Sequence, residues 1–251
     1  MTIEEIQKEN DILKKENELK GEIISMTGHQ VRTSLSAMKW VIKMFLDHDF
    51  GDLSNEQEQM LKKASEQNER VIALVSEMLT LNKATEGSIP YTFESIDPVK
   101  LVEKILFEFM SESYKKKVEL IFLRPENSVP EILADINKIH IVIENIMDNA
   151  IKYSKEGDKV FISITPNEKT VDITVKDTGI GIPPEVQERI FTKFFRADNA
   201  QSKDSLGSGI GLYMCKKIID AHHGSLTFES TGHGSSFHIL IPRVVATNNT
   251  K

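Results

Sequence analysis

Three residues in the second half of the chain have side chains and spacing that suit a metal–phosphate ligand. Asn145, Asn149 and Lys152 recur at intervals of four and three residues in a stretch that predicts a helix over 136–153, so their side chains share one helix face. An amide oxygen can ligate Mg²⁺, and a lysine beside it can neutralise phosphate charge. An ordinary polar helix face would carry the same residue types, so this cluster alone does not decide between the two interpretations.

A second cluster lies in the run DTGIGIP over 177–183, directly after a predicted strand. The carboxylate of Asp177 can accept a hydrogen bond from an exocyclic amine such as that of adenine. Gly179 and Gly181 would let the backbone approach a flat base closely. A turn that ends a strand also favours Asp and Gly, so this run is compatible with a simple turn.

A third cluster is rich in glycine and leads into a predicted helix over 209–222. Gly207, Gly209 and Gly211 alternate with other residues, and Leu212 follows. Glycines at a helix N-terminus expose backbone N–H groups to an anion. No Gly-Lys-Ser/Thr follows, which disfavours a Walker-type NTPase. The glycines follow a loop and not a first strand, which disfavours a dinucleotide-binding fold.

Long helices precede these clusters in the chain. Over 3–20, Ile3, Ile6, Asn10, Leu13 and Asn17 recur at alternating intervals of three and four, which is typical of a coiled coil. A single amphipathic helix with no partner would show the same pattern over so short a stretch, and both interpretations stay open.

The helical pattern continues to Leu46 and breaks over 48–52. Ser54 and Gln57 then have the spacing of a capping box, which predicts the start of a second long helix. Two long amphipathic helices with a short connection form an antiparallel hairpin. One hairpin cannot cover both of its apolar faces, whereas two hairpins can do so as a four-helix bundle. The helices therefore predict a homodimer.

After the linker-like run TEGSIP over 85–90, the pattern changes to mixed strands and helices. We expect helices over 98–114, 136–153, 184–192 and 209–222, and strands over 118–123, 159–165, 170–176, 225–230 and 236–241. The fold class predicted for the whole chain is multidomain: an all-α hairpin forming a dimeric four-helix bundle, followed by an α/β sandwich with helices on one face of a mixed sheet.

The composition excludes several classes of protein. The 251 residues carry 31 Lys and Arg against 38 Asp and Glu, a formal charge of −7 without a basic block, so we expect no nucleic-acid partner. The single cysteine, Cys215, cannot form an intramolecular disulfide. We expect no membrane segment, because no apolar run approaches the required length. These features favour a cytoplasmic location, either of a soluble protein or of the intracellular part of a membrane-anchored protein.

In this order and spacing, the three clusters resemble the N, G1 and G2 boxes of the GHKL ATP-binding superfamily. The run 191–196 resembles the F box of histidine kinases, and the run HQVRTSL over 29–35 resembles their H box. The matching phenylalanines of the F-box run are Phe191, Phe194 and Phe195. The closing motifs of the family are matched by His222, Gly224, Gly232, Gly234 and Phe237, with His223 in place of a usual glycine. The resemblance covers roughly residues 20 to 242.

The resemblance implies a role for each matching residue. His29 would be the phospho-accepting nucleophile, with Gln30, Thr33 and Arg196 as further catalytic positions. ATP would be bound by Asn145, Asn149, Lys152, Tyr153, Asp177, Gly179, Gly181, Gly207, Gly209, Gly211 and Leu212. Asn149 would hold Mg²⁺, with Asn145 as a candidate second ligand. The resemblance also implies how the chain is divided. A coiled-coil signalling helix would cover 1–20, and a dimerisation and phosphotransfer hairpin would cover 21–84. A linker over 85–92 would lead to a Bergerat/GHKL-type ATP-binding domain over 93–243, followed by a tail over 244–251.

Two positions depart from the H box. Most relatives have Glu or Asp where this chain has Gln30, and proline where it has Ser34. A carboxylate would raise the basicity of the attacking nitrogen, whereas an amide contributes no charge. Serine in place of proline removes a cause of helix bending.

The resemblance implies an ATP-dependent histidine kinase that phosphorylates His29, passes the phosphoryl group to the aspartate of a response-regulator receiver domain, and dephosphorylates the regulator through Thr33. Two alternatives stay open. Gln30 would suit an ATP-binding phosphatase or interaction module with little autokinase activity. A GHKL ATPase of the chaperone or topoisomerase kind is disfavoured, because such enzymes have a glutamate where this chain has Asn145, and Glu144 lies off that helix face.

Overall fold

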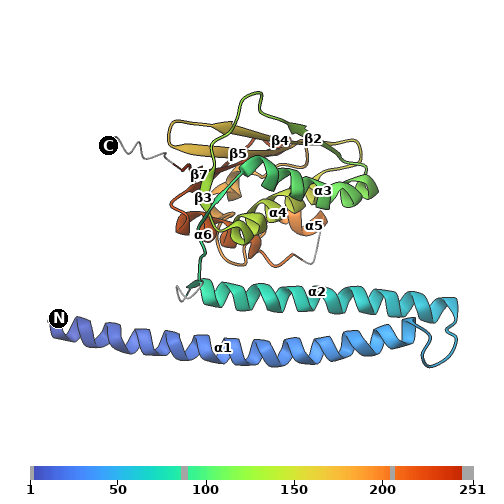
Figure 1. Ribbon diagram of the computed structural model, residues 1–251. Coiled ribbons are helices and arrows are strands. Elements are labelled where there is room, and N and C mark those ends of the chain that lie inside the picture. The colour runs from blue at the N-terminus through green and yellow to red at the C-terminus, as the bar shows by residue number, and fades with distance from the viewer. Residues whose placement is uncertain (1–2, 86–89, 204–206, 245–251) are drawn as a thin grey trace. The chain divides into compact units, whose positions relative to one another are not determined.

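The computed structural model describes residues 3–85, 90–203 and 207–244. The chain divides into two compact units, Met1–Ile89 and Pro90–Lys251. The first is the predicted helical hairpin, and the second is the predicted mixed α/β domain (Figure 1).

The first unit consists of the helices α1 (Ile3–Leu46) and α2 (Asn55–Thr85), which run antiparallel (Figure 1). The predicted capping box opens α2, since Gln57 N–H donates to Ser54 Oγ at 3.2 Å and Ser54 N–H donates to Gln57 Oε1 at 2.9 Å. The backbone is helical over 3–20 as expected. Most side chains of that stretch lie outside the described residues, so the coiled-coil packing stays a prediction.

The two helices are joined closely at two levels. A Cβ at Gly28 would lie 2.6 Å from Leu79 Cδ2, so α2 packs directly on the backbone of α1 beside His29. Further along, the Asn68 side-chain amide donates to the Leu35 carbonyl at 2.9 Å. These contacts hold α1 and α2 together at both ends of the H-box segment.

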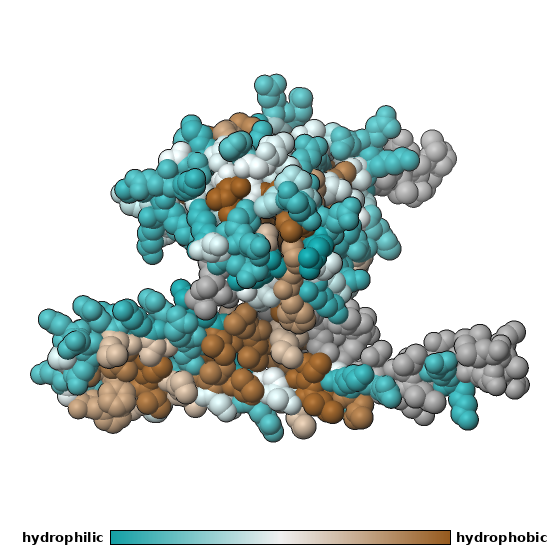
Figure 2. Space-filling view, turned by 180° about the vertical axis from the view of Figure 1, so that it is seen from behind, coloured by the Kyte–Doolittle hydropathy of each residue, from teal (hydrophilic) through white to brown (hydrophobic). Residues whose placement is uncertain are grey.

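The hairpin leaves many large apolar side chains uncovered, and Figure 2 shows several of them gathered along one face of the helices. They include Leu19, Ile23, Met26, Met38, Trp40, Val41, Met60 and Met78. Monomeric proteins rarely expose so long an apolar surface. This surface has the character expected of an interface between two hairpins.

The second unit is built on a five-stranded sheet in the order β2-β4-β5-β7-β6. Its strands are β2 (Glu119–Leu123), β4 (Lys159–Pro166), β5 (Thr170–Asp177), β6 (Ser225–Ser230) and β7 (Ser235–Pro242). The pair β2–β4 is parallel and all other pairs are antiparallel. The sheet is therefore mixed, as predicted.

The helices α3 (Pro98–Lys116), α4 (Ile136–Tyr153) and α6 (Gly211–Ala221) lie against one face of this sheet (Figure 1). Asp97 caps α3 by accepting N–H groups of Val99 and Lys100. Asp135 caps α4 in the same way. Such caps satisfy N–H groups that have no partner within the helix, which explains why both helices begin where the sequence predicts.

One core joins the sheet and the three helices. It is formed by alternate residues of β4, β5 and β7 and by the inner faces of the helices, and its fully buried members include Ile105, Ile139, Ile143, Ile162, Ile173, Ile219, Ile239 and Ile241. The alternation along the strands matches a sheet with a single covered face. The remaining face of α4 is thereby left to the polar residues of the candidate site.

Several expected elements differ in detail. The predicted helix over 184–192 is a short 3-10 helix, Pro184–Arg189, because Pro183 and Pro184 open it and the chain turns away at Ile190. The predicted helix over 209–222 begins only at Gly211, since Gly209 has φ +70°. Three elements were not predicted: α5 (Asp198–Lys203) and the antiparallel pair of β1 (Glu94–Ile96) with β3 (Ile132–Ala134).

Candidate functional site

The polar face of α4 has the arrangement that its spacing predicts. Asn145, Asn149 and Lys152 are all half-buried. The Asn145 amide nitrogen donates to the Ile141 carbonyl at 2.8 Å, which leaves its Oδ1 facing Gly211. The side chain of Asn149 makes no hydrogen bond to another residue in the described part of the chain. Its amide oxygen is therefore free to accept an external ligand.

Asp177 lies at the end of β5, 7% exposed. Its Oδ1 accepts the Gly179 N–H at 2.8 Å. Burial raises the pKa of this carboxyl, and the backbone N–H groups of Gly179 and Ser235 act against that rise. A donor placed by a ligand would favour the ionised form, so the site is suited to an amine-bearing group.

The loop after Asp177 packs on the end of α4. The Ile180 N–H donates to the Tyr153 carbonyl at 3.2 Å. The Ile182 N–H donates to Ser230 Oγ at 2.8 Å, and that hydroxyl donates to the Gly234 carbonyl at 2.8 Å. Tyr153, Gly179 and Gly181 are thus brought together as expected, and the β6–β7 turn supports the loop from behind.

The glycines before α6 lie beside two other predicted clusters. Gly209 has φ +70°, and a Cβ there would lie 2.7 Å from the Phe194 carbonyl carbon, so only glycine fits without strain. A Cβ at Gly211 would lie 2.7 Å from Asn145 Oδ1. The N-terminus of α6 therefore meets the polar face of α4, while Leu212 packs against the core.

The F-box segment connects these glycines to the core. Phe194 has φ +62°, and its N–H donates to the Gly209 carbonyl at 3.0 Å. Phe195 packs against the core with the Arg189 guanidinium 4.3 Å from its ring centroid. Arg196 lies beside Gly207, since a Cβ there would be 3.0 Å from its Cζ. The predicted positions Arg196, Gly207 and Gly209 therefore form one cluster.

Two residues of α5 also reach this region, and sequence reasoning missed them. The Asn199 amide donates to the Gly181 carbonyl at 3.0 Å. Lys203 Nζ donates to the Ser154 carbonyl at 2.6 Å, and burial lowers the pKa of this ammonium. Both residues tie α5 across the loop that follows Asp177. No spacing rule marks them, because each contact depends on a distant backbone carbonyl.

His222, from the closing motifs, has a structural role. It is buried, its Nε2 accepts the Asp135 N–H at 3.0 Å, and its Nδ1 donates to the Ile218 carbonyl at 2.7 Å. Burial lowers the pKa of this imidazole, which is consistent with a neutral ring that accepts at one nitrogen. His222 joins the end of α6 to the start of α4.

His29 lies exposed on α1 in the first unit. Within the described residues its ring makes no hydrogen bond or ion pair, so its nitrogens are available to a reactant. Thr33 Oγ1 donates to the His29 carbonyl at 2.9 Å, and Ser34 Oγ donates to the Gln30 carbonyl at 3.1 Å. The helix is continuous through Ser34, as expected for a chain without proline there.

Among the residues that the structure describes, no group of three His, Cys, Asp or Glu side chains is placed to hold a metal ion. A metal in the α4 site would therefore depend on amide oxygens and on the ligand's own oxygens. In the same described part, none of the helices has the length and apolar character needed to cross a bilayer.

Two family descriptions match the chain. Residues 19–87 match the His Kinase A (phospho-acceptor) domain. Residues 134–245 match the histidine kinase-, DNA gyrase B- and HSP90-like ATPase family. The first match contains the hairpin with His29, and the second contains all three glycine- and asparagine-bearing clusters.

Curated relatives and solved structures agree with these matches. The chain is 30% identical to the adaptive-response sensory kinase SasA of Crocosphaera subtropica over 94% of its own length and 63% of SasA. It is 26% identical to the sensor protein SrrB of Staphylococcus aureus over 97% of its length and 41% of SrrB. The chain thus spans less than two thirds of these relatives.

Among solved structures, the catalytic domain of the histidine kinase ThkA matches 61% of the chain and 98% of the ThkA domain, with 29% identity and a TM-score of 0.54. Full-length ShkA in complex with AMPPNP matches 90% of the chain and 46% of ShkA, with 23% identity and a TM-score of 0.75. The likeness to ShkA concerns the fold alone.

Proposed function

The chain belongs to the histidine kinases, and we propose that it uses ATP to phosphorylate its own His29 and then passes the phosphoryl group to an aspartate of a response regulator. The observation that carries the proposal is that two features occur in one chain. The hairpin carries an exposed histidine, and the nucleotide-type site has no carboxylate at position 145. The second match is to an ATPase-type domain, which supports ATP as the substrate.

The α4 face and the Asp177 loop would hold the nucleotide. Asp177 would accept a hydrogen bond from the adenine amine, because its Oδ1 is already bonded to Gly179 and its other oxygen remains an acceptor. Lys152 would lie near the phosphates and neutralise part of their charge. The N-terminus of α6 would supply backbone N–H groups to the same phosphates.

Mg²⁺ fits the donor set of α4. The ion prefers oxygen ligands and retains several waters, so one or two amide oxygens together with phosphate oxygens suffice. Asn149 and, second, Asn145 would hold it, and the bound ion would reduce the negative charge on the phosphates. Neither asparagine can act as a general base.

The absence of a base at position 145 favours transfer to His29 over hydrolysis. A ring nitrogen of His29 would attack the γ-phosphorus, the N–P bond would form, and the bond to the β–γ bridging oxygen would break as ADP leaves. The second ring nitrogen loses its proton afterwards. Such a reaction needs positioning and charge neutralisation more than covalent assistance.

Thr33 supports a second activity of the same hairpin, dephosphorylation of the regulator. Its hydroxyl donates to the His29 carbonyl one turn back, an interaction weak enough to be exchanged for a water molecule. We also propose that two chains associate through the apolar face of the hairpin, as the exposed side chains there require cover.

Incubation with γ-labelled ATP tests the proposal. The expected result is label on the protein that is absent from the His29→Gln variant. The competing phosphatase or interaction module, which Gln30 favours, would bind ATP without turnover. A chaperone-type ATPase would release free phosphate. Either of these two results would refute autophosphorylation.

A further inference from the structure

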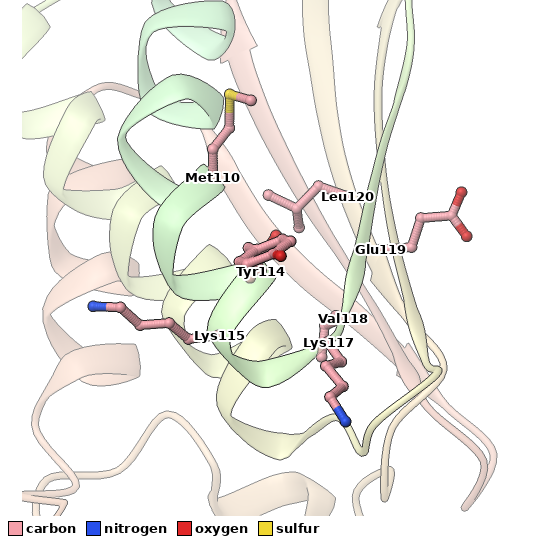
Figure 3. A pocket seen from close by; sticks show the side chains of 8 residues that line it. Met110, Tyr114, Lys115, Lys117, Val118, Glu119 and Leu120 are labelled. Carbon is pink, nitrogen blue, oxygen red and sulfur yellow. The ribbon is translucent and has the colours of Figure 1, made fainter.

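Buried polar atoms without a hydrogen-bond partner are rare in folded proteins, and each one calls for an explanation. Within the part of the chain that the structure describes, three side chains have such an atom: Asn68, Asp172 and Arg243. None of them lines the cavity of about 830 Å³ between α3 and β2 (Figure 3). Only Asn68 is buried as a whole residue, at 5% exposure, and it lies in the hairpin that carries His29.

Asn68 occupies a position where two packed helices normally have apolar side chains. The less exposed residues of α2 recur at intervals of three and four and include Leu61, Ser65, Asn68, Ile72, Val75 and Leu79. Asn68 and Leu79 of this row both contact α1, at Leu35 and Gly28. A single polar residue in such a row specifies how the helices pair, at a cost in stability.

The Asn68 amide makes one hydrogen bond and leaves its oxygen without one. Its Nδ2 donates to the Leu35 carbonyl at 2.9 Å, whereas its Oδ1 is buried and has no partner among the described residues. One hydrogen bond adds little net stability, and an unsatisfied buried acceptor costs at least as much. Stability therefore does not explain an asparagine at this position, and the contact that it makes with α1 does.

The segment of α1 beside this contact has competing hydrogen bonds. Thr33 Oγ1 donates to the His29 carbonyl at 2.9 Å, and Ser34 Oγ donates to the Gln30 carbonyl at 3.1 Å. Hydroxyls that bond the carbonyl four residues back weaken a helix slightly and often bend it. The bond from α2 at Leu35 falls one residue beyond this stretch, so it anchors the weakened segment.

The other contacts between the helices leave this anchor necessary. Before His29, a Cβ at Gly28 would lie 2.6 Å from Leu79 Cδ2, so steric contact fixes α1 there. Beyond the H box, Lys39 Nζ pairs with Glu69 Oε1 at 2.9 Å, but both side chains are more than half exposed. Exposed ion pairs contribute little. The buried amide is thus the stronger polar link at the C-terminal end of the H box.

We propose that Asn68 is a positioning residue for phosphoryl transfer to His29, because its bond to the Leu35 carbonyl holds the H-box segment in one orientation against α2. The inference rests on the proposed autophosphorylation of His29. A displacement of about 1 Å at a reacting group can lower a rate about 100-fold. With an apolar side chain at position 68, the segment would bend more freely, and His29 would spend less time where it can attack.

Autophosphorylation of the whole chain tests the proposal through Asn68→Leu. We expect kcat for labelling to fall at least about tenfold and KM for ATP to stay within about twofold, because the nucleotide site lies in the second unit. The melting temperature should stay the same or rise, since the unsatisfied oxygen is removed. A residue needed only for folding would lower it. Gln67→Leu, at the neighbouring exposed position of α2, is the matched control and should change neither quantity.

Hydrogen exchange of backbone amides reports the anchoring without any kinase activity. In Asn68→Leu, the amides of residues 33–39 should exchange about fivefold faster, as expected for the loss of one hydrogen bond, while the amides of α2 keep their protection. Absence of label on the wild type would refute the proposed function. Unchanged exchange in Asn68→Leu, with a wild type that does carry label, would refute the anchoring alone.

Asn68→Asp provides a rescue that depends on pH. Burial raises the pKa of a carboxyl, and the protonated form can donate to the Leu35 carbonyl as the amide does, whereas the ionised form cannot. The labelling rate relative to wild type should therefore rise at least about threefold as the pH falls from about 8 to about 6. Division by the wild-type rate removes the titration of every group that the two chains share, the Lys39–Glu69 pair included. The same ratio for Asn68→Leu should stay constant.

Three results would overturn the proposal. The first is a kcat of Asn68→Leu within about twofold of wild type. The second is a lower kcat that comes with a lower melting temperature, without rescue of Asn68→Asp at low pH. The third is dissociation of Asn68→Leu into monomers in light scattering, which would assign the asparagine to the contact between two chains.

Discussion

Asp177→Asn is expected to weaken ATP binding strongly while leaving the fold intact. In the wild type, one carboxylate oxygen accepts the Gly179 N–H at 2.8 Å. An asparagine that keeps this bond turns its NH₂ group to the position of the second oxygen. That group is a donor, and the adenine amine that it would face is a donor as well.

The size of the effect follows from the burial of Asp177, which is 7% exposed. A hydrogen bond to a charged group contributes about 1.5–3 kcal/mol, and facing donors remove it entirely. A loss of about 2 kcal/mol corresponds to roughly a 30-fold increase in Kd. GTP presents a carbonyl at the position of the adenine amine, so the substitution should reduce the preference for ATP over GTP.

The pH dependence provides an independent check. Burial raises the pKa of Asp177, and the ionised form is the one that accepts from adenine. Affinity for ATP should therefore fall as the pH is lowered through this raised pKa, at a higher pH than an ordinary aspartate would give. Because the folded-state pKa is raised, Asp177 favours folding at low pH, and this contribution is lost as the pH rises through the folded pKa. The pH dependence of ATP affinity and the pH dependence of folding stability should both be reduced in the Asp177→Asn variant.

Calorimetric titration with ATP and GTP between pH 4.5 and about 8 measures these effects. Asp220→Asn is the matched control, because Asp220 is an exposed carboxylate on α6 that pairs with Lys216. If Asp177→Asn binds ATP within about threefold of wild type, or if the control weakens binding equally, the assignment of Asp177 to adenine is refuted.

The remaining predictions concern the hairpin and the metal ligand. His29→Gln should abolish autophosphorylation and leave the Kd for ATP within about twofold, since the two groups lie in separate units; retained label would place the nucleophile elsewhere. Gln30→Glu should speed autophosphorylation several-fold, because a carboxylate bonded to the imidazole favours the transition state by about 1 kcal/mol; an initial labelling rate no faster than wild type would contradict this. Thr33→Ala should lower regulator dephosphorylation more than autophosphorylation, and an equal loss of both rates would indicate a packing defect instead. Asn149→Asp should reduce the use of Mg²⁺-ATP, because it changes the metal ligand and adds charge beside the phosphates; undiminished labelling would exclude Asn149 as the ligand.

The local elements could be predicted from the sequence because their causes are local. The capping box at Ser54 and Gln57 opens α2, and aspartates cap α3 and α4. The mixed α/β architecture followed from the change between helical and alternating periods. The family could be recognised because its motifs are short, ordered runs whose residue types are demanded by backbone geometry, as at Gly209.

Other features were decided only by the tertiary structure. The strands β1 and β3 are each three residues long, too short for a periodic pattern to be visible, and their paired positions lie 36 to 40 residues apart in the chain. The contacts of Asn199 and Lys203 depend on backbone carbonyls at Gly181 and Ser154, which no spacing rule connects to them. The open edge of β2 likewise follows from the strand order and not from its residues. Periodicity and caps report what each segment prefers, whereas sheet order and carbonyl partners arise when distant segments pack together.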